Sequence, residues 1–155
     1  MTLVFYDGAC GLCDRFVQFL LARDPAGRIR FAQLQGELAR RELIPSGHDP
    51  ADLDSVFVVA GWQTSRPQVL TRSRAVLHAI GMLGGFWTVA AGLAGLVPQA
   101  IADRAYALIA RRRYSLFGHF DACPLPRPEW RNRFLDESGS RSSIHKAQNA
   151  ETPKP

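Results

Sequence analysis

Two cysteines, Cys10 and Cys13, stand three positions apart directly after a short apolar run at residues 3–6. Behind them, apolar residues recur at helical spacing through residues 16–21. The pattern predicts a strand, a tight turn at Asp7-Gly8, and a helix that begins at the first cysteine. A thiol at a helix N-terminus lies beside unpaired N–H groups and the positive end of the helix dipole, which lower its pKa. A Cys-x-x-Cys in this setting is typical of a dithiol–disulfide redox site.

The two cysteines are expected to have different roles. Cys10 is nearer the exposed start of the helix, so we expect it to be the attacking thiolate. Cys13, one turn further in and more buried, would resolve the mixed disulfide. Asp7 is either a proton acceptor during exchange or a turn residue whose carboxylate binds backbone N–H groups. Inert core cysteines are the alternative. The only redox group expected is the Cys10–Cys13 disulfide itself, with no further cofactor.

Three stretches of the chain resemble the DCC family of thiol-disulfide oxidoreductases. Tyr6-Asp7-Gly8 with Cys10-x-x-Cys13 carries the first match, and residues 71–77 carry another. The third consists of Arg113-Tyr114, Phe117-Gly118 and Asp121-Ala122-Cys123-Pro124. Together they span most of residues 2–135. The resemblance implies a thioredoxin-like fold and a role in thiol–disulfide exchange.

The order of the expected elements agrees with an α/β, thioredoxin-like fold with a central four-stranded mixed sheet, flanking helices and a helical C-terminal extension. Strands are expected at residues 2–6, 29–34, 55–60 and 69–70. Helices are expected at 11–22, 37–43, from Ser73 onward, at 86–96, and from Pro98 to about 114. Residues 1–135 form a single domain in this interpretation. Residues 136–155 are polar and are expected to be a disordered tail.

One departure from thioredoxins concerns the backbone beside the dithiol. Thioredoxins place a cis-proline there, ahead of their third sheet strand. We place the corresponding segment just before Val69 or at Thr71-Arg72, where the only proline, Pro67, lies several residues early. The backbone that holds a substrate is therefore expected to differ from that of thioredoxins.

A candidate substrate-binding group lies at Thr71, Arg72, Ser73 and Arg74. Ser73 directly precedes a periodic apolar run, so we expect it to be a helix N-cap. The stretch is similar to the motif in which a serine of thioredoxin-like glutathione transferases holds the γ-glutamyl carboxylate of glutathione. A helix N-terminus with two arginines suits an anion. The alternative is a plain cap with solvated arginines.

Two other functions remain open on the sequence. Cys10, Cys13, His119 and Cys123 supply the four soft ligands of a structural zinc site, although the gap before His119 is long for such a site. The fold could also be a non-catalytic thioredoxin-like binding module. In the redox interpretation no metal is expected. The segment 121–124 would then lie near the dithiol, where Asp121, Cys123, Tyr6 and Gly8 shape the pocket without Cys123 taking part in exchange.

The net charge of +5 comes from scattered arginines, and the only run is Arg111-Arg112-Arg113. We expect this run to complement a helix C-terminus, and we expect no nucleic-acid binding. The expected partner is a disulfide-containing protein or a glutathione-like thiol. Three cysteines in all are too few for a secreted disulfide scaffold, so a reducing cytoplasm is expected.

The uncharged stretch at residues 80–97 is close to the shortest length that could span a membrane. Gly84-Gly85 interrupts it, because adjacent glycines disfavour a continuous helix. We therefore expect the end of one helix followed by a second, buried helix, and no membrane span.

Overall fold

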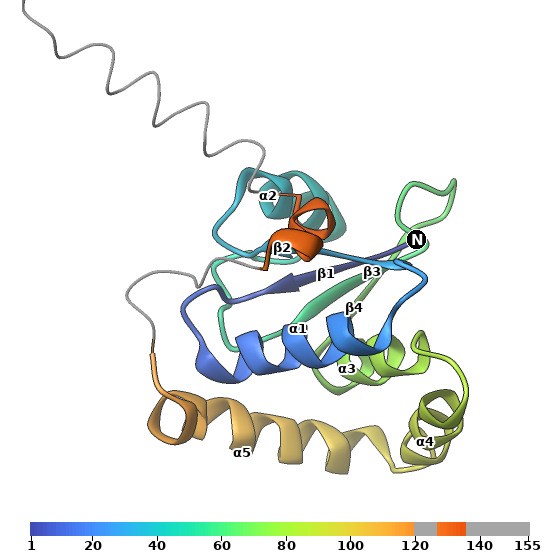
Figure 1. Ribbon diagram of the computed structural model, residues 1–155. Coiled ribbons are helices and arrows are strands. Elements are labelled where there is room, and N and C mark those ends of the chain that lie inside the picture. The colour runs from blue at the N-terminus through green and yellow to red at the C-terminus, as the bar shows by residue number, and fades with distance from the viewer. Residues whose placement is uncertain (120–126, 136–155) are drawn as a thin grey trace, which may run out of the picture.

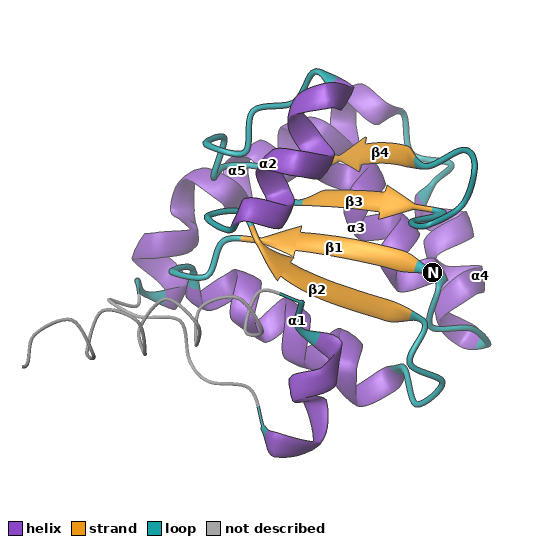
Figure 2. Cartoon of the chain, turned by 90° about the horizontal axis from the view of Figure 1, so that it is seen from above, coloured by secondary structure: helices purple, strands orange, loops and turns teal. Residues whose placement is uncertain are grey.

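A four-stranded mixed sheet organises the computed structural model, which describes residues 1–119 and 127–135. The strands are β1 (Thr2–Tyr6), β2 (Ile29–Gln33), β3 (Phe57–Ala60) and β4 (Gln68–Thr71), in the order β2-β1-β3-β4. β1 pairs in parallel with β2 and antiparallel with β3, and β3 pairs antiparallel with β4 (Figure 2). This arrangement confirms the predicted fold class.

Helices cover both faces of the sheet. They are α1 (Gly11–Arg23), α2 (Glu37–Leu43), α3 (Arg72–Gly81), α4 (Phe86–Ala94) and α5 (Gln99–Phe117), with short 3-10 helices at Ile44–Ser46 and Pro128–Arg133. In Figure 1, α1 and α3 lie on one side of the sheet, α2 lies on the other, and α4 and α5 lie beyond α1 and α3. α4 and α5 therefore form an additional outer layer on the side of the sheet that α1 covers.

β1 is the central strand of the core, and all five of its residues are buried. Leu3 and Phe5 pack with the residues of α2, whereas Val4 and Tyr6 pack with those of α1 and α3. At the end of the described part, the N–H of Leu135 donates to the carbonyl of Phe31 in the sheet (2.9 Å). Residues 136–155, the predicted tail, lie outside the described part.

The pairing register brings three loops to one end of the sheet. Phe5 lies opposite Phe57, and Phe57 lies opposite Thr71, so the segments after β1, before β3 and after β4 meet at that end. The segment ahead of the third strand is thus Asp54-Ser55-Val56, and our placement of it near Val69 was wrong. Pro67 precedes Gln68, which pairs with Ala60 at the opposite end of the sheet.

The expectation that residues 86–96 form a helix was correct, but the expectation that this helix is buried was wrong. α4 forms, but none of its residues is buried, and Phe86, Val89 and Leu93 are 75%, 62% and 63% exposed. Within the described ranges, no helix combines the length and apolar character that crossing a membrane requires.

Candidate active site

Cys10 is the N-cap residue of α1, as the sequence predicts. Its backbone is extended (φ −96°), and its Sγ accepts a hydrogen bond from the N–H of Cys13 at 3.4 Å. A sulfur in this position receives the kind of N–H group that stabilises an anion at a helix N-terminus. Neither Cys10 nor Cys13 is joined to another cysteine in the structure.

The expectation that Cys10 is the more exposed of the pair was wrong. Cys10 is 0% exposed and Cys13 is 6% exposed. The C-terminal end of α5 covers the start of α1: the Gly11 N–H donates to the Gly118 carbonyl (3.3 Å), and Cys10 forms an isolated antiparallel bridge with His119. The sequence analysis considered only the local strand–helix unit, and the cover comes from residues that are distant in the sequence.

Gly11 allows this close contact between α1 and α5. A Cβ atom at position 11 would lie 2.1 Å from the carbonyl oxygen of Phe117, which is far inside van der Waals contact. The first residue between the two cysteines can therefore carry no side chain unless the end of α5 moves.

The pKa values of the two thiols move in opposite directions. The pKa of Cys10 falls to about 6, chiefly because the Cys13 thiol donates a hydrogen bond to it, with help from the Cys13 N–H and the charge of Arg113, against the effect of burial. The pKa of Cys13 rises, because that same hydrogen bond and burial both favour its protonated form. These shifts favour a thiolate at Cys10 and a thiol at Cys13.

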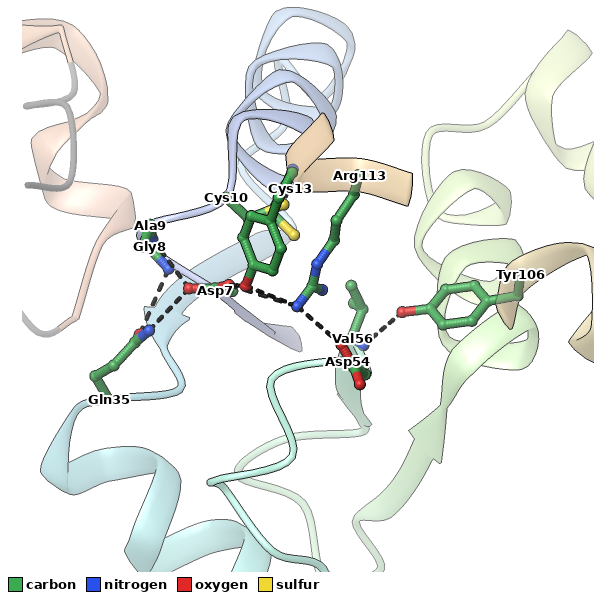
Figure 3. Close-up of polar contacts among 11 residues, drawn as sticks. Asp7, Gly8, Ala9, Cys10, Cys13, Gln35, Asp54, Val56, Tyr106 and Arg113 are labelled. Carbon is green, nitrogen blue, oxygen red and sulfur yellow. Dashed lines mark hydrogen bonds and ion pairs between the residues drawn. The ribbon is translucent and has the colours of Figure 1, made fainter. Parts of the chain in front are cut away.

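Asp7 is buried beside the dithiol and is surrounded by donors (Figure 3). Its carboxylate accepts hydrogen bonds from the Ala9 N–H (3.0 Å), the Gln35 amide (2.8 Å) and the Tyr114 hydroxyl (2.6 Å). Burial raises its pKa, but these bonds and the charge of Arg113 outweigh burial, so the pKa lies below its usual value. Asp7 therefore makes the backbone contact of a turn residue and remains a carboxylate.

Arg113 supplies a buried positive charge next to Asp7. Its Nη2 lies 3.6 Å from Asp7 Oδ2 and 3.3 Å from Asp54 Oδ1, and it donates to the Tyr114 hydroxyl at 2.9 Å. Its side chain is 3% exposed. In Figure 3 the guanidinium extends from beside the two cysteines toward Asp7 and Asp54. The interpretation of this residue as part of a helix-end charge run was wrong, because α5 continues to Phe117 and Arg113 faces inward.

Three further residues of the site, Gln35, Asp54 and Tyr106, were missed by sequence reasoning, and Tyr114 entered it only as part of the family resemblance, without a role. The Tyr106 hydroxyl accepts a hydrogen bond from the Val56 N–H (2.8 Å) and so holds the loop before β3. The available signal was the spacing of Tyr106, Arg113 and Tyr114, which places them on one side of a helix. α5 thus carries a polar and aromatic face toward the dithiol.

A family model for DCC1-like thiol-disulfide oxidoreductases matches residues 4–119. The chain belongs to this family. It is 38% identical over 134 residues to the uncharacterized protein YuxK of Bacillus subtilis, covering 86% of this chain and 93% of that protein. It is 32% identical over 123 residues to a chloroplastic DCC family protein of Arabidopsis thaliana, covering 79% and 69% respectively. No solved structure matches.

In this DCC1-like chain, the predicted substrate-binding residues are divided between two places. Thr71, not Ser73, is the N-cap of α3, because β4 leads directly into the helix through Arg72, whose φ is +53°. The Arg72 N–H donates to the Val56 carbonyl (3.2 Å), at the dithiol end of the sheet. The Ser73 hydroxyl instead donates to Asp103 (2.5 Å).

Ser73 and Arg74 line an open cavity of about 430 Å³ between β4, α3 and the start of α5. The other residues that line it are Gln68, Leu70, Leu77, His78, Gly95, Val97, Gln99 and Ala102. Neither cysteine of the dithiol belongs to this lining. The structure therefore does not join Ser73 and Arg74 to the dithiol in one pocket.

The remaining candidate residues lie partly outside the described ranges. Tyr6 is buried with its ring edge-on to Phe134 (centroids 6.3 Å apart), and the Gly8 N–H donates to Gln35 (3.4 Å). Asp121 and Cys123 lie outside the described ranges, and Cys123 is also the fourth ligand of the zinc alternative. Within residues 1–119 and 127–135, no three His, Cys, Asp or Glu side chains are grouped so that they could hold a metal ion.

Proposed function

We propose that this chain is a thiol–disulfide oxidoreductase in which Cys10 attacks the substrate disulfide and Cys13 resolves the product. The observation that carries the proposal is the position of the Cys10 sulfur as the N-cap of α1, where it accepts the Cys13 N–H. Membership of the DCC1-like family supports the same class of reaction. The residues between the cysteines carry no charged side chain, so the support for a Cys10 thiolate comes from the Cys13 thiol, from the backbone and from Arg113.

The exchange takes place in two displacements. The Cys10 thiolate attacks one sulfur of the substrate disulfide, forms a Cys10–substrate disulfide, and releases the other sulfur as a thiolate that takes a proton from water. The Cys13 thiol then gives up its proton and attacks Cys10 Sγ. The second substrate sulfur leaves as a thiolate and takes up a proton. The protein dithiol is thereby oxidised to the Cys10–Cys13 disulfide, and one substrate disulfide is reduced to two thiols.

Asp7 and Arg113 support this cycle as a fixed charge pair. Protonation of Asp7 would weaken its bonds to Ala9, Gln35 and Tyr114, which makes the carboxylate a poor proton acceptor. Its main role in the proposal is to hold Arg113, whose positive charge favours the Cys10 thiolate. The role as a proton relay for Cys13 is therefore secondary.

Access to Cys10 limits the choice of substrate. Since Cys10 is 0% exposed, the chain across it at Gly118 and His119 has to move before any disulfide reaches the sulfur. A glutathione-like disulfide requires a smaller displacement than a protein disulfide does. We propose a small-thiol disulfide or a flexible protein segment as the substrate.

The covered thiol also favours a second candidate function. A thioredoxin-like module that binds a partner without turnover does not need an accessible Cys10 sulfur. The fold alone does not decide between an oxidoreductase and such a binding module. The reactivity of Cys10 distinguishes the two functions.

Cysteine variants test the proposal. Cys13→Ser treated with oxidised glutathione is expected to accumulate a stable mixed disulfide at Cys10, whereas Cys10→Ser accumulates little, with intact-mass spectrometry as the measurement. The rate of Cys10 alkylation by iodoacetamide in the wild type should rise with pH through a midpoint near 6, because only the thiolate reacts. A free cysteine has its midpoint at about 8.5.

Cys123→Ser is the matched control, and it should behave like the wild type in both measurements. If Cys13→Ser traps no glutathione and Cys10 titrates near or above about 8.5, the redox proposal is wrong and the binding-module function takes its place.

A further inference from the structure

The outer surface of α4 and α5 is unusually apolar for a surface in contact with water. Eleven large hydrophobic side chains of the described residues are exposed, and nine of them lie between Phe86 and Leu116. These nine define the α4–α5 face: Phe86, Val89, Leu93, Leu96, Val97, Ile101, Leu108, Ile109 and Leu116, which are 44–79% exposed. Figure 1 shows both helices on the outside of the molecule, with α1 and α3 between them and the sheet.

α5 presents this face because it has two distinct sides. Tyr106, Ala110 and Arg113 point inward, where Tyr106 and Arg113 bind the loop before β3 and Ala110 is buried. The apolar stripe through Ile101 and Leu108, which are seven residues apart, lies on the outward side. The stripe therefore faces away from the core.

The charged side chains that the α4–α5 segment itself carries are almost all positive. Residues 80–119 contain four arginines and one acidic residue, Asp103. Asp103 accepts the hydroxyl of Ser73, and Arg113 is buried in the site. The remaining cations, Arg104, Arg111 and Arg112, are exposed on α5 beside the apolar stripe.

We propose that the α4–α5 face is a peripheral membrane-binding surface that rests on an anionic lipid bilayer. Its apolar side chains would enter the boundary between headgroups and acyl chains, and the three exposed arginines would contact lipid phosphates. The helices lie along the surface and do not cross the bilayer, in keeping with their length and composition.

The charge distribution favours a lipid surface over a second copy of the chain. In a symmetric dimer the same patch meets itself, so Arg104, Arg111 and Arg112 of both copies would be gathered in one interface. The described residues of the patch include no exposed acidic side chain to compensate them, and juxtaposed like charges are unfavourable. An anionic bilayer satisfies both the apolar area and the positive charge.

Vesicle flotation of the full chain tests the proposal. The protein should float with vesicles of 70% phosphatidylcholine and 30% phosphatidylglycerol, and not with pure phosphatidylcholine. Leu93→Glu and Leu96→Glu should abolish flotation. Ile44→Glu is the matched control, because Ile44 is 58% exposed on the opposite side of the sheet, beside α2, and this variant should float like the wild type.

The arginines provide an independent measurement. Each of Arg104→Gln, Arg111→Gln and Arg112→Gln should weaken partitioning onto the anionic vesicles by about fivefold. Arg66→Gln, an exposed arginine in the turn between β3 and β4, should have no such effect. The circular dichroism spectra and melting temperatures of all variants should match the wild type, because the replaced side chains are exposed.

Three results would each overturn the proposal. The first is absence of flotation with the anionic vesicles. The second is flotation that the Leu93→Glu and Leu96→Glu variants retain. The third is a concentration-dependent dimer in analytical ultracentrifugation that both variants abolish, without vesicle binding by the wild type, which would assign the face to a second copy.

Discussion

The guanidinium of Arg113 is buried between the carboxylates of Asp7 and Asp54, and its charge lowers the pKa of Cys10. A guanidinium stays protonated throughout the physiological range, so this support for a thiolate does not depend on pH. Asp54 is 78% exposed, whereas Asp7 is buried. Asp7 is therefore the partner that fixes the position of Arg113.

Removing this charge should make Cys10 less acidic. In Arg113→Gln, the midpoint of the Cys10 alkylation rate is expected to rise by about one pH unit, because a nearby opposite charge lowers a pKa by about 1–3 units. Arg113→Lys keeps the charge and should restore most of the shift. The measurement is the pH profile of iodoacetamide alkylation, followed by peptide mass spectrometry.

Arg112→Gln is the control for this series, because Arg112 is exposed on the outward side of α5. An unchanged midpoint in Arg113→Gln would show that the Cys10 thiolate depends on α1 alone. A midpoint that rises equally in Arg112→Gln would mean that the effect is a general one of net charge.

The sequence predicts the candidate redox residues of the first motif better than it predicts their surroundings. Cys10, Cys13 and Asp7 lie within seven positions, so a local pattern of strand, turn and helix is enough to place them together. Arg113 and Tyr114 contact Asp7 from the other end of the domain. The exposed Ile101 and Leu108 lie on the outward side of α5, so the usual rule that apolar residues face the core does not identify its inward side.

At the level of elements, the contact between the start of α1 and the end of α5 determines access to the dithiol. Two backbones meet there, at Gly11 and Phe117–Gly118, without intervening side chains. Such a contact tolerates no added volume on the Gly11 side.

Gly11→Ala should loosen this contact. The new methyl group would overlap the Phe117 carbonyl, so we expect a loss of stability of about 1–3 kcal/mol, the usual range for overpacking. The displaced cover should also raise the alkylation rate of Cys10 at a pH above its midpoint. Thermal unfolding and alkylation kinetics are the two measurements.

Gly92→Ala is the matched control in α4, since a Cβ there meets nothing within 4 Å. It should stabilise the protein by up to about 1 kcal/mol through helix propensity, and alkylation should not change. Equal behaviour of the two variants would contradict the role assigned to the contact.

The sequence predicts the positions of the helices and strands well, but not the burial of α4. Glycines, prolines and apolar periodicity are local signals, and they place α1, α2, α3 and β1 within a few residues. Burial depends on whether another element packs against a helix. For α4 the described part of the chain provides no such element on its outer side, and Leu93 remains 63% exposed.

At the level of the whole molecule, a buried ion pair joins the last described segment to the first helix. Arg133 contacts Asp24 at the end of α1, and its Nε donates to the Ile29 carbonyl (2.8 Å). Phe134 stacks on Phe31 with centroids 5.5 Å apart. Residues 133–135 thus pack against β2, an edge strand of the sheet.

Arg133→Met should destabilise the protein by about 3 kcal/mol, because it removes the buried cation of Asp24 and leaves only the half-exposed Arg28, 3.9 Å from the carboxylate. Urea denaturation measures this loss. Arg131→Met, an exposed neighbour in the same 3-10 helix, should change the free energy of unfolding by less than about 0.5 kcal/mol. Similar losses in both variants would show that the ion pair does not contribute specifically.

The contact between Tyr114 and Asp7 spans 107 positions of the sequence, which has a consequence for the chain during its synthesis. Domains generally fold as units while translation proceeds from the N-terminus. The two cysteines emerge first, long before α5 exists to provide Arg113 and to cover them. Until α5 docks, Cys10 lacks both, so the part of the lowering of its pKa that comes from Arg113 is absent. A nascent chain therefore carries both cysteines before it carries the cover and the positive charge that α5 supplies to Cys10 in the folded chain.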